Sequence, residues 1–153
     1  MNPPKNINDK VDKLDEMYSE KAKELKKHTN TDKIKENLKK YKTDEELIIL
    51  IESGSLAPPH KMHIGLMEIV KKYIEENSNK KVVGGFLIPS SDGYVKYKLK
   101  KDFISLNHRV NMTKLWIKNS DWLECLDWGL AYGEDIKILC TGKICFRFRY
   151  RQT

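Results

Sequence analysis

The sequence predicts an α/β fold in which a parallel sheet is connected by crossover helices. Short apolar runs at residues 47–51 and 82–88 are typical of strands that are covered on both faces. Segments with helical patterning follow these runs, and this alternation is the pattern of strand–helix–strand units. The chain has 153 residues, of which 39% are hydrophobic and 33% charged, as expected of one domain with an ordinary core.

Residues 1–45 are predicted to form a helical N-terminal arm rich in lysine and glutamate. Apolar residues recur three or four positions apart, which places them on one face of a helix. The polar stretch "HTNT" interrupts the spacing, so two helices or one broken helix are expected. Because the stripe is thin, an arm that lies on the domain is favoured over a coiled-coil partner. The stripe comprises Val11, Leu14, Tyr18, Ala22, Leu25, Ile34, Leu38 and Tyr41.

Residues 46–142 are predicted to form the α/β domain, which begins with the strand 47–51. A second strand covers 82–88, and the lysine-rich stretch "PSSDGYVKYKLKKD" is expected to be a mobile basic loop. A helix over 106–119 is followed by strands in "DWLECLDW" and "DIKILCTG". The helix between the first two strands is expected to start near Lys61, with one apolar face formed by His63, Leu66, Met67, Val70 and Ile74.

The net charge of +7 favours anionic partners such as nucleotides, nucleic acid or acidic surfaces. Lysines alternate with acidic residues along the arm, and this mixed pattern disfavours nucleic acid. No apolar run is long enough to cross a membrane, and the first ten residues lack the apolar segment of a secretory signal. The cysteines form no CxxC pair, which is typical of reduced thiols in an intracellular protein of the cytoplasm or nucleus. They are Cys125, Cys140 and Cys145.

The most informative stretch is "GSLAPPHKMHIG", which lies between the first strand and the first helix of the domain. Ligands of open parallel sheets bind at the carboxyl ends of the strands. Gly54 allows a ligand to approach the backbone, and Pro58 and Pro59 stiffen the loop. His60 lies in this loop and His63 in the first helical turn, where free amides and the helix dipole favour an anion. The stretch therefore predicts a phosphate site that is neither a Walker A loop nor a glycine-rich dinucleotide turn.

Four of these residues fit the pattern G-x-x-x-P-x-H-x-x-H, which resembles the signature of the nucleotidylyltransferase superfamily: Gly54, Pro58, His60 and His63. The residues that follow are similar to the eukaryotic-type nicotinamide/nicotinic acid mononucleotide adenylyltransferases. The resemblance covers roughly residues 48–128 and implies a Rossmann-like parallel sheet of the nucleotidylyltransferase type. The matching residues are Asp92, Tyr94, His108, Arg109, Met112, Asn119, Ser120, Trp122, Glu124 and Trp128.

The resemblance implies a reaction in NAD biosynthesis. An adenylyl group passes from ATP to nicotinamide or nicotinic acid mononucleotide, which gives NAD or deamido-NAD and pyrophosphate. The 5′-phosphate of the mononucleotide would attack the α-phosphorus in line, so the protein's part is positioning and charge stabilisation. Mg²⁺ would bridge the ATP phosphates and be bound mostly by substrate oxygens and water rather than by a protein metal site.

The resemblance also implies a role for each matching position. His60 and His63 would hold the ATP phosphates, with His63 closest to the reacting centre. The backbone of Ser55 and Leu56 would meet the mononucleotide, and one lysine of the basic loop would reach a phosphate. The other predicted binding residues are Gly54, Pro58, Gly142 and the candidate lysines Lys96, Lys98 and Lys100, between which the spacing does not decide. The supporting residues are Asp92, Tyr94, His108, Arg109 and Trp122.

The last part of the sequence departs from the family. Between Trp128 and Ile136 there is no Glu-Trp-x-x-Thr segment, and after Gly142 there is no Ile-Ser-x-Thr-x-x-Arg motif, which binds the ATP phosphates in the family. Residues 143–153 form a basic-aromatic tail whose alternation is typical of a strand. We therefore expect a chain that lacks the family's C-terminal half, leaves a sheet edge open and makes little dinucleotide by itself.

The alternative to an active enzyme is a non-catalytic nucleotide-binding or interaction protein that keeps this half-site. A basic residue that closes over the β- and γ-phosphates would favour the enzyme. The sequence leaves open a homo-oligomer, the preference for the amide or the acid mononucleotide, and the roles of the arm and the tail.

Overall fold

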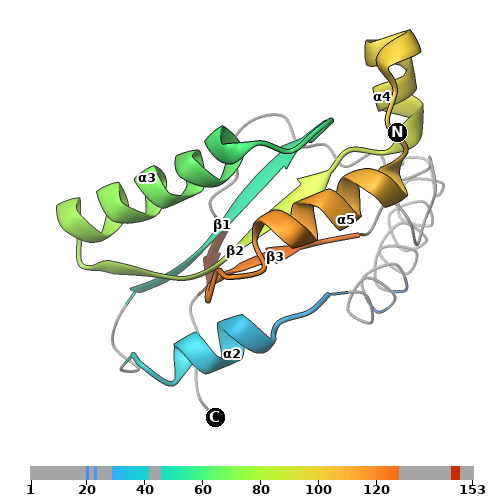
Figure 1. The fold of residues 1–153 in the computed structure, drawn as a ribbon. Helices are drawn as coiled ribbons and strands as arrows, with labels where there is room; N and C mark the ends of the chain where they lie inside the picture. Colours follow the sequence, from blue (N-terminus) through green and yellow to red (C-terminus); the bar gives the residue numbers. More distant parts are fainter. Residues whose placement is uncertain (1–19, 21–22, 24–28, 42–45, 128–145, 149–153) are drawn as a thin grey trace, which may run out of the picture.

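The computed structural model describes residues 20, 23, 29–41, 46–127 and 146–148. Their sheet has the strand order β3-β2-β1-β4. β1 (Glu46–Gly54) is parallel to β2 (Lys80–Pro89), and β2 is parallel to β3 (Leu123–Cys125). The crossover helices α3 (Lys61–Asn77) and α5 (Leu106–Trp116) lie on one side of the sheet (Figure 1). The predicted α/β fold with a parallel sheet and crossover helices is therefore confirmed.

β4 (Phe146–Phe148) joins the sheet in the opposite direction to the other strands. It pairs with β1 from Leu47 to Ile49, so the strand expected in the basic-aromatic tail is present at these residues. The residues of the predicted strand "DIKILCTG" lie outside the described part of the chain. None of the described helices is both long enough and apolar enough to cross a bilayer.

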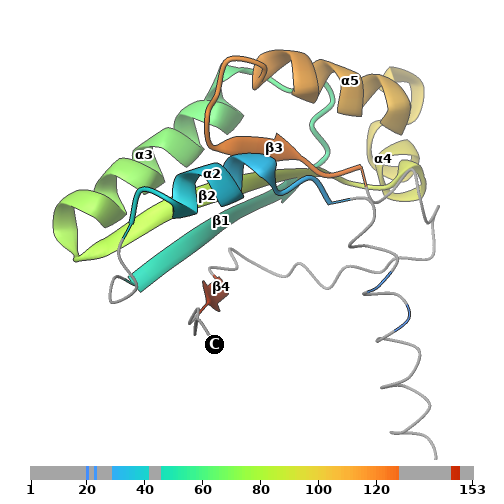
Figure 2. The same cartoon turned by 90° about the horizontal axis from the view of Figure 1, so that it is seen from below.

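The sheet separates two apolar layers. On the side of α3 and α5, Ile48 and Leu50 of β1 pack with Met67 and Val110. On the other side, Ile34 of α2 (Asp32–Leu38) packs with residues of β2 and with Leu126 (Figure 2). The predicted N-terminal arm thus contains the helix α2, which packs on the sheet. Residues 1–19 of the predicted arm lie outside the described part of the chain.

Two adjacent glycines in β2 let both layers approach the sheet closely. A Cβ atom at Gly84 would overlap the Ile34 side chain of α2. A Cβ atom at Gly85, which faces the other layer, would meet Leu123, Trp122 and Met67 within 3 Å. Close approach of neighbouring elements is one of the reasons for glycine inside a strand.

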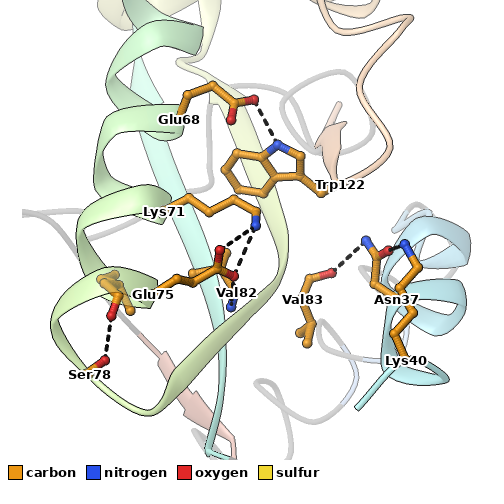
Figure 3. Close-up of polar contacts among 10 residues, drawn as sticks. Asn37, Lys40, Glu68, Lys71, Glu75, Ser78, Val82, Val83 and Trp122 are labelled. Carbon is orange, nitrogen blue, oxygen red and sulfur yellow. Dashed lines mark hydrogen bonds and ion pairs between the residues drawn. The ribbon is translucent and has the colours of Figure 1, made fainter.

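Polar contacts fix the helices on each side of the sheet (Figure 3). On the α3 side, the Trp122 indole donates to Glu68 Oε1 at 2.9 Å, and Glu75 Oε1 accepts a hydrogen bond from the Val82 amide at 3.0 Å. On the α2 side, the Asn37 Nδ2 atom donates to the Val83 carbonyl at 3.2 Å. These bonds satisfy backbone groups and a buried indole that packing alone would leave unpaired.

The structure corrects the predicted buried face of α3. Leu66 is 43% exposed, whereas Ile64 packs against the core together with Val70 and Ile74. Both faces of this helix carry apolar residues at helical spacing, because Met62, Leu66 and Ile69 are exposed on the outer side. The predicted face is thus confirmed at Met67, Val70 and Ile74 and corrected at Leu66.

The expected basic loop is also corrected. The stretch contains the helix α4 (Asp92–Leu99) and a 3₁₀ turn, η1 (Lys100–Asp102), beyond the carboxyl ends of β1 and β2 (Figure 1). Pro, Ser and Gly stand only before or at its first turn, so they mark the start of the helix rather than a loop. The third strand and the last helix are where they were predicted, but they end earlier, at Cys125 and Trp116.

Candidate functional site

The candidate site lies at the carboxyl end of β1, in the loop that leads to α3. The Gly54 carbonyl accepts a hydrogen bond from the Ser90 amide at 2.8 Å, which ties the ends of β1 and β2 together. Leu56 has a left-handed backbone with φ of 45°, and its side chain is 1% exposed. Such a conformation costs a branched residue about 1–3 kcal/mol, which burial of the side chain in the core offsets. The loop is therefore held in a defined shape.

Two histidines meet at the first turn of α3. The ring centroids of His60 and His63 are 3.9 Å apart, and the His60 amide donates to His63 Nδ1 at 3.1 Å. Because Nδ1 accepts this bond, the neutral His63 ring carries its proton on Nε2. Burial, followed by the charge of His60, lowers the pKa of His63 below its ordinary value. His63 therefore favours the neutral form near pH 7 and offers one N–H donor.

One of the three candidate lysines reaches the loop after β1. The Lys98 ammonium on α4 donates to Ser55 Oγ at 3.3 Å and lies 5.9 Å from the Tyr94 ring. Lys96 instead lies over the Phe103 ring at 5.2 Å. Lys100 is the C-cap of α4, with φ of 50°. The structure thus brings Lys98, rather than the other two, to the loop that carries the histidines.

Arg109 joins three segments around the site. Its side chain is fully buried and donates to the Ser55 carbonyl at 2.7 Å and to the Ile104 carbonyl at 2.9 Å. It also donates to Asp92 Oδ1 at 3.0 Å, and the same oxygen accepts from the Leu106 amide at 2.6 Å. The loop after β1, the start of α4 and the start of α5 are therefore fixed relative to one another.

The remaining predicted residues lie in different surroundings. Trp122 is buried beneath α3, where it supports the helix through Glu68 (Figure 3). His108 is on the exposed side of α5, and Gly142 lies outside the described residues. The residues that the fold does bring to the carboxyl end of β1 and the start of α3 are Gly54, Ser55, Leu56, Pro58, His60, His63 and Lys98.

Glu52 is a residue of this region that the sequence analysis did not single out. It lies on β1 two positions before Gly54, and its Oε2 atom is buried without a hydrogen-bond partner in the described part of the chain. Burial raises the pKa of this carboxyl above its ordinary value. The available signal was a single charged residue directly after a continuous apolar run, at the end of a strand.

The converging groups favour a polyanionic ligand. The first turn of α3 supplies backbone N–H groups, His63 supplies an imidazole donor, and Lys98 supplies a positive charge. Among the described residues there is no group of three His, Cys, Asp or Glu side chains that could hold a metal ion. The arrangement can therefore position and stabilise phosphate groups, and the described side chains do not themselves form a metal centre.

Comparison with known proteins identifies relatives over the same region. A family model described as Cytidylyltransferase-like matches residues 51–144. The nicotinamide/nicotinic acid mononucleotide adenylyltransferase 1 of Bos taurus is 38% identical over 81 residues, which are 53% of this chain and 27% of the relative. The nicotinamide-nucleotide adenylyltransferase of Drosophila melanogaster is 31% identical over 104 residues, 68% of this chain and 26% of the relative. The chain thus spans about a quarter of the length of these curated relatives.

Proposed function

The chain belongs to the Cytidylyltransferase-like family, and on that premise we propose that it transfers an adenylyl group from ATP to a pyridine mononucleotide. The products are NAD or deamido-NAD and pyrophosphate. The observation that carries the proposal is the pair His60 and His63 at the first turn of α3, joined through the His60 amide. The names of the matching relatives, mononucleotide adenylyltransferases, support the choice of substrates.

The ATP phosphates are bound at the start of α3. His63 donates from Nε2, and the free amides of the first turn add donors in the direction that the helix dipole favours. Preorganised donors of this kind stabilise the charge of a transition state by about 3 kcal/mol each. His60 is more exposed than His63, and its contribution to the phosphates is correspondingly smaller.

Transfer needs two anions to be held in line. An oxygen of the mononucleotide 5′-phosphate forms a bond to the α-phosphorus of ATP, and the bond from that phosphorus to the bridging oxygen breaks, which releases pyrophosphate. Because the attacking phosphate is already an anion, the site needs no general base. Lys98, held beside Ser55, offsets the repulsion between the two substrates. Mg²⁺ would enter with ATP and supply positive charge to its phosphates, bound mostly by substrate oxygens and water.

Calorimetric titration with Mg-ATP tests the phosphate site. We expect His63→Ala to weaken binding roughly 100-fold and His60→Ala roughly tenfold, since the lost donors differ in burial. Lys72→Ala is the matched control, because Lys72 is an exposed cation farther along α3 that forms an ion pair with Glu76. Binding by both histidine variants at the wild-type affinity would contradict the proposed site, as would a folded wild-type chain that binds no nucleotide.

A coupled assay for NAD separates an enzyme from a nucleotide-binding protein. We expect the chain to be a weakly active form, so dinucleotide formation is slow, and slow formation that His63→Ala abolishes supports adenylyl transfer. Tight nucleotide binding with no detectable dinucleotide, at saturating mononucleotide, would instead favour the non-catalytic alternative.

A further inference from the structure

Glu52 carries a carboxylate oxygen that the described residues leave unpaired. Its Oε2 atom is buried and has no hydrogen-bond partner among the described residues. An unpaired buried acceptor is unfavourable, and a charged one more so. Two glutamates of α3 differ from Glu52 because their carboxylates have donors: Glu68 accepts a hydrogen bond from Trp122, and Glu75 accepts one from Lys71. Glu52 Oε2 is therefore the buried side-chain oxygen that lacks a donor among the described residues.

The position of Glu52 on β1 is near the candidate site. Side chains alternate along a strand, so Glu52 lies on the same face of β1 as Ile48 and Leu50, which pack beneath α3. Its register partner on β2, Leu87, belongs to the same apolar layer. Glu52 and Gly54 are two positions apart, so the Cα atom of Glu52 lies about 7 Å from the end of the strand that leads to the histidine pair.

The chemistry of a carboxylate limits what it can bind there. It repels phosphate, and the described residues supply no second and third ligand for a metal ion. The neutral donors of a nucleotide that occur as an adjacent pair are the ribose 2′- and 3′-hydroxyls. Carboxylates near the carboxyl ends of parallel strands accept hydrogen bonds from ribose hydroxyls in dinucleotide-binding folds.

We propose that Glu52 accepts hydrogen bonds from the ribose hydroxyls of a nucleotide bound at the end of β1 and so selects ribonucleotides. This inference rests on the proposed function. Hydrogen bonds to charged groups are among the stronger ones, so the hydroxyls increase affinity roughly 10- to 100-fold. The ribose belongs either to ATP or to the mononucleotide, and the two sources are separable by titration.

The test compares ligands with and without the hydroxyls. The wild-type chain is titrated with ATP, 2′,3′-dideoxy-ATP and inorganic tripolyphosphate, and separately with nicotinamide mononucleotide and its 2′-deoxy analogue. We expect one of the two nucleotides to bind at least about tenfold more tightly than its deoxy form. Glu52→Gln reduces this preference to roughly threefold, and the apolar Glu52→Met, of similar volume, abolishes it. Glu46→Gln removes a carboxylate from the other end of β1 and keeps the preference.

Each result has one meaning. Equal binding of both nucleotides and their deoxy forms by the wild type overturns the inference, and this arm needs no variant. A preference that persists undiminished in folded Glu52→Met, as judged by thermal unfolding, also overturns it. If neither ATP nor tripolyphosphate binds the folded wild-type chain, the proposed function itself fails. Tripolyphosphate affinity that is unchanged or increased in Glu52→Gln, together with loss of the ribose preference, supports the inference.

Discussion

Arg109 and Glu52 are charged residues that differ in whether their buried polar atoms have hydrogen-bond partners. Arg109 is fully buried, but its guanidinium finds two carbonyls and the Asp92 carboxylate. Glu52 has a buried oxygen atom with no donor among the described residues. A satisfied buried charge fixes the structure around it, whereas an unsatisfied one costs stability until a ligand supplies the missing bond.

The pH dependence of stability reports this cost for Glu52. Burial raises the pKa of Glu52 in the folded chain above the ordinary value of 4.5. Well below pH 4.5 the carboxyl is protonated in both states, so the charge imposes no penalty. As the pH rises through the raised pKa, the unfolded chain has already released the proton, and the folded chain loses stability relative to it.

A variant without the Glu52 carboxyl does not lose this stability as the pH rises. We expect the free energy of unfolding of Glu52→Gln, relative to the wild type, to increase from pH 4 to pH 7. Urea unfolding at a series of pH values measures the difference, in which the contributions of the other titrating groups cancel. A difference that stays constant over this range would contradict the assignment of an unpaired, desolvated Glu52.

At the scale of elements, α2 and the centre of β2 depend on each other. Ile34 of α2 is buried against the sheet at Gly84, where no side chain would fit. The Asn37 side chain donates to the carbonyls of Val83 and Asp121, so the helix is tied to two neighbouring strands or their ends. The N-terminal arm is thus part of the fold at residues 32–38, where it covers the second face of the sheet.

Gly84→Ala tests this packing. We expect a loss of about 1–3 kcal/mol of stability, because the added methyl group overlaps Ile34 and pushes α2 from the sheet. Ile34→Ala creates a cavity and costs about 2–5 kcal/mol by itself. In the double variant the methyl group added at position 84 fills part of the space that Ile34→Ala empties, so the combined loss, measured by denaturant unfolding, is smaller than the sum of the single losses. Strict additivity would show that Ile34 does not pack on Gly84.

At the scale of the whole molecule, one buried residue, Arg109, connects the candidate site to the core. Arg109 holds the Ser55 carbonyl of the loop that carries the histidines, and it also anchors Asp92 at the start of α4, the helix of Lys98. The shape of the site is therefore a consequence of core packing, and a change at Arg109 affects stability and ligand binding together.

Arg109→Lys keeps the positive charge but not the geometry of the guanidinium, so it tests whether the loop after β1 needs that geometry. One ammonium group cannot replace the planar fork that reaches three acceptors, so we expect a lower melting temperature and weaker Mg-ATP binding. Arg109→Met removes all three of these hydrogen bonds, leaves Asp92 with its bond from the Leu106 amide, and costs at least about 2 kcal/mol of stability. The control is Lys114→Met on the same helix, whose exposed ion pair with Asp127 contributes little. Normal binding by folded Arg109→Lys would show that the loop keeps its shape without the guanidinium.

The sequence by itself determined the local features of this protein. Apolar runs and helical spacing are properties of a few neighbouring residues, and they predicted the parallel strands and the two crossover helices. The motif from Gly54 to His63 is equally local, and the phosphate site that its residues indicate stays a prediction.

The tertiary structure decided the features that depend on residues far apart in the chain. Lys98 and Arg109 reach Ser55 across 43 and 54 positions, and no spacing rule could select Lys98 over its two neighbours. The buried face of α3, the role of Gly84 and the unpaired Glu52 are likewise set by which surfaces pack together. Periodicity shows which residues share one face of a helix or strand. What that face contacts depends on how the elements pack, because burial and hydrogen bonding are properties of the assembled core.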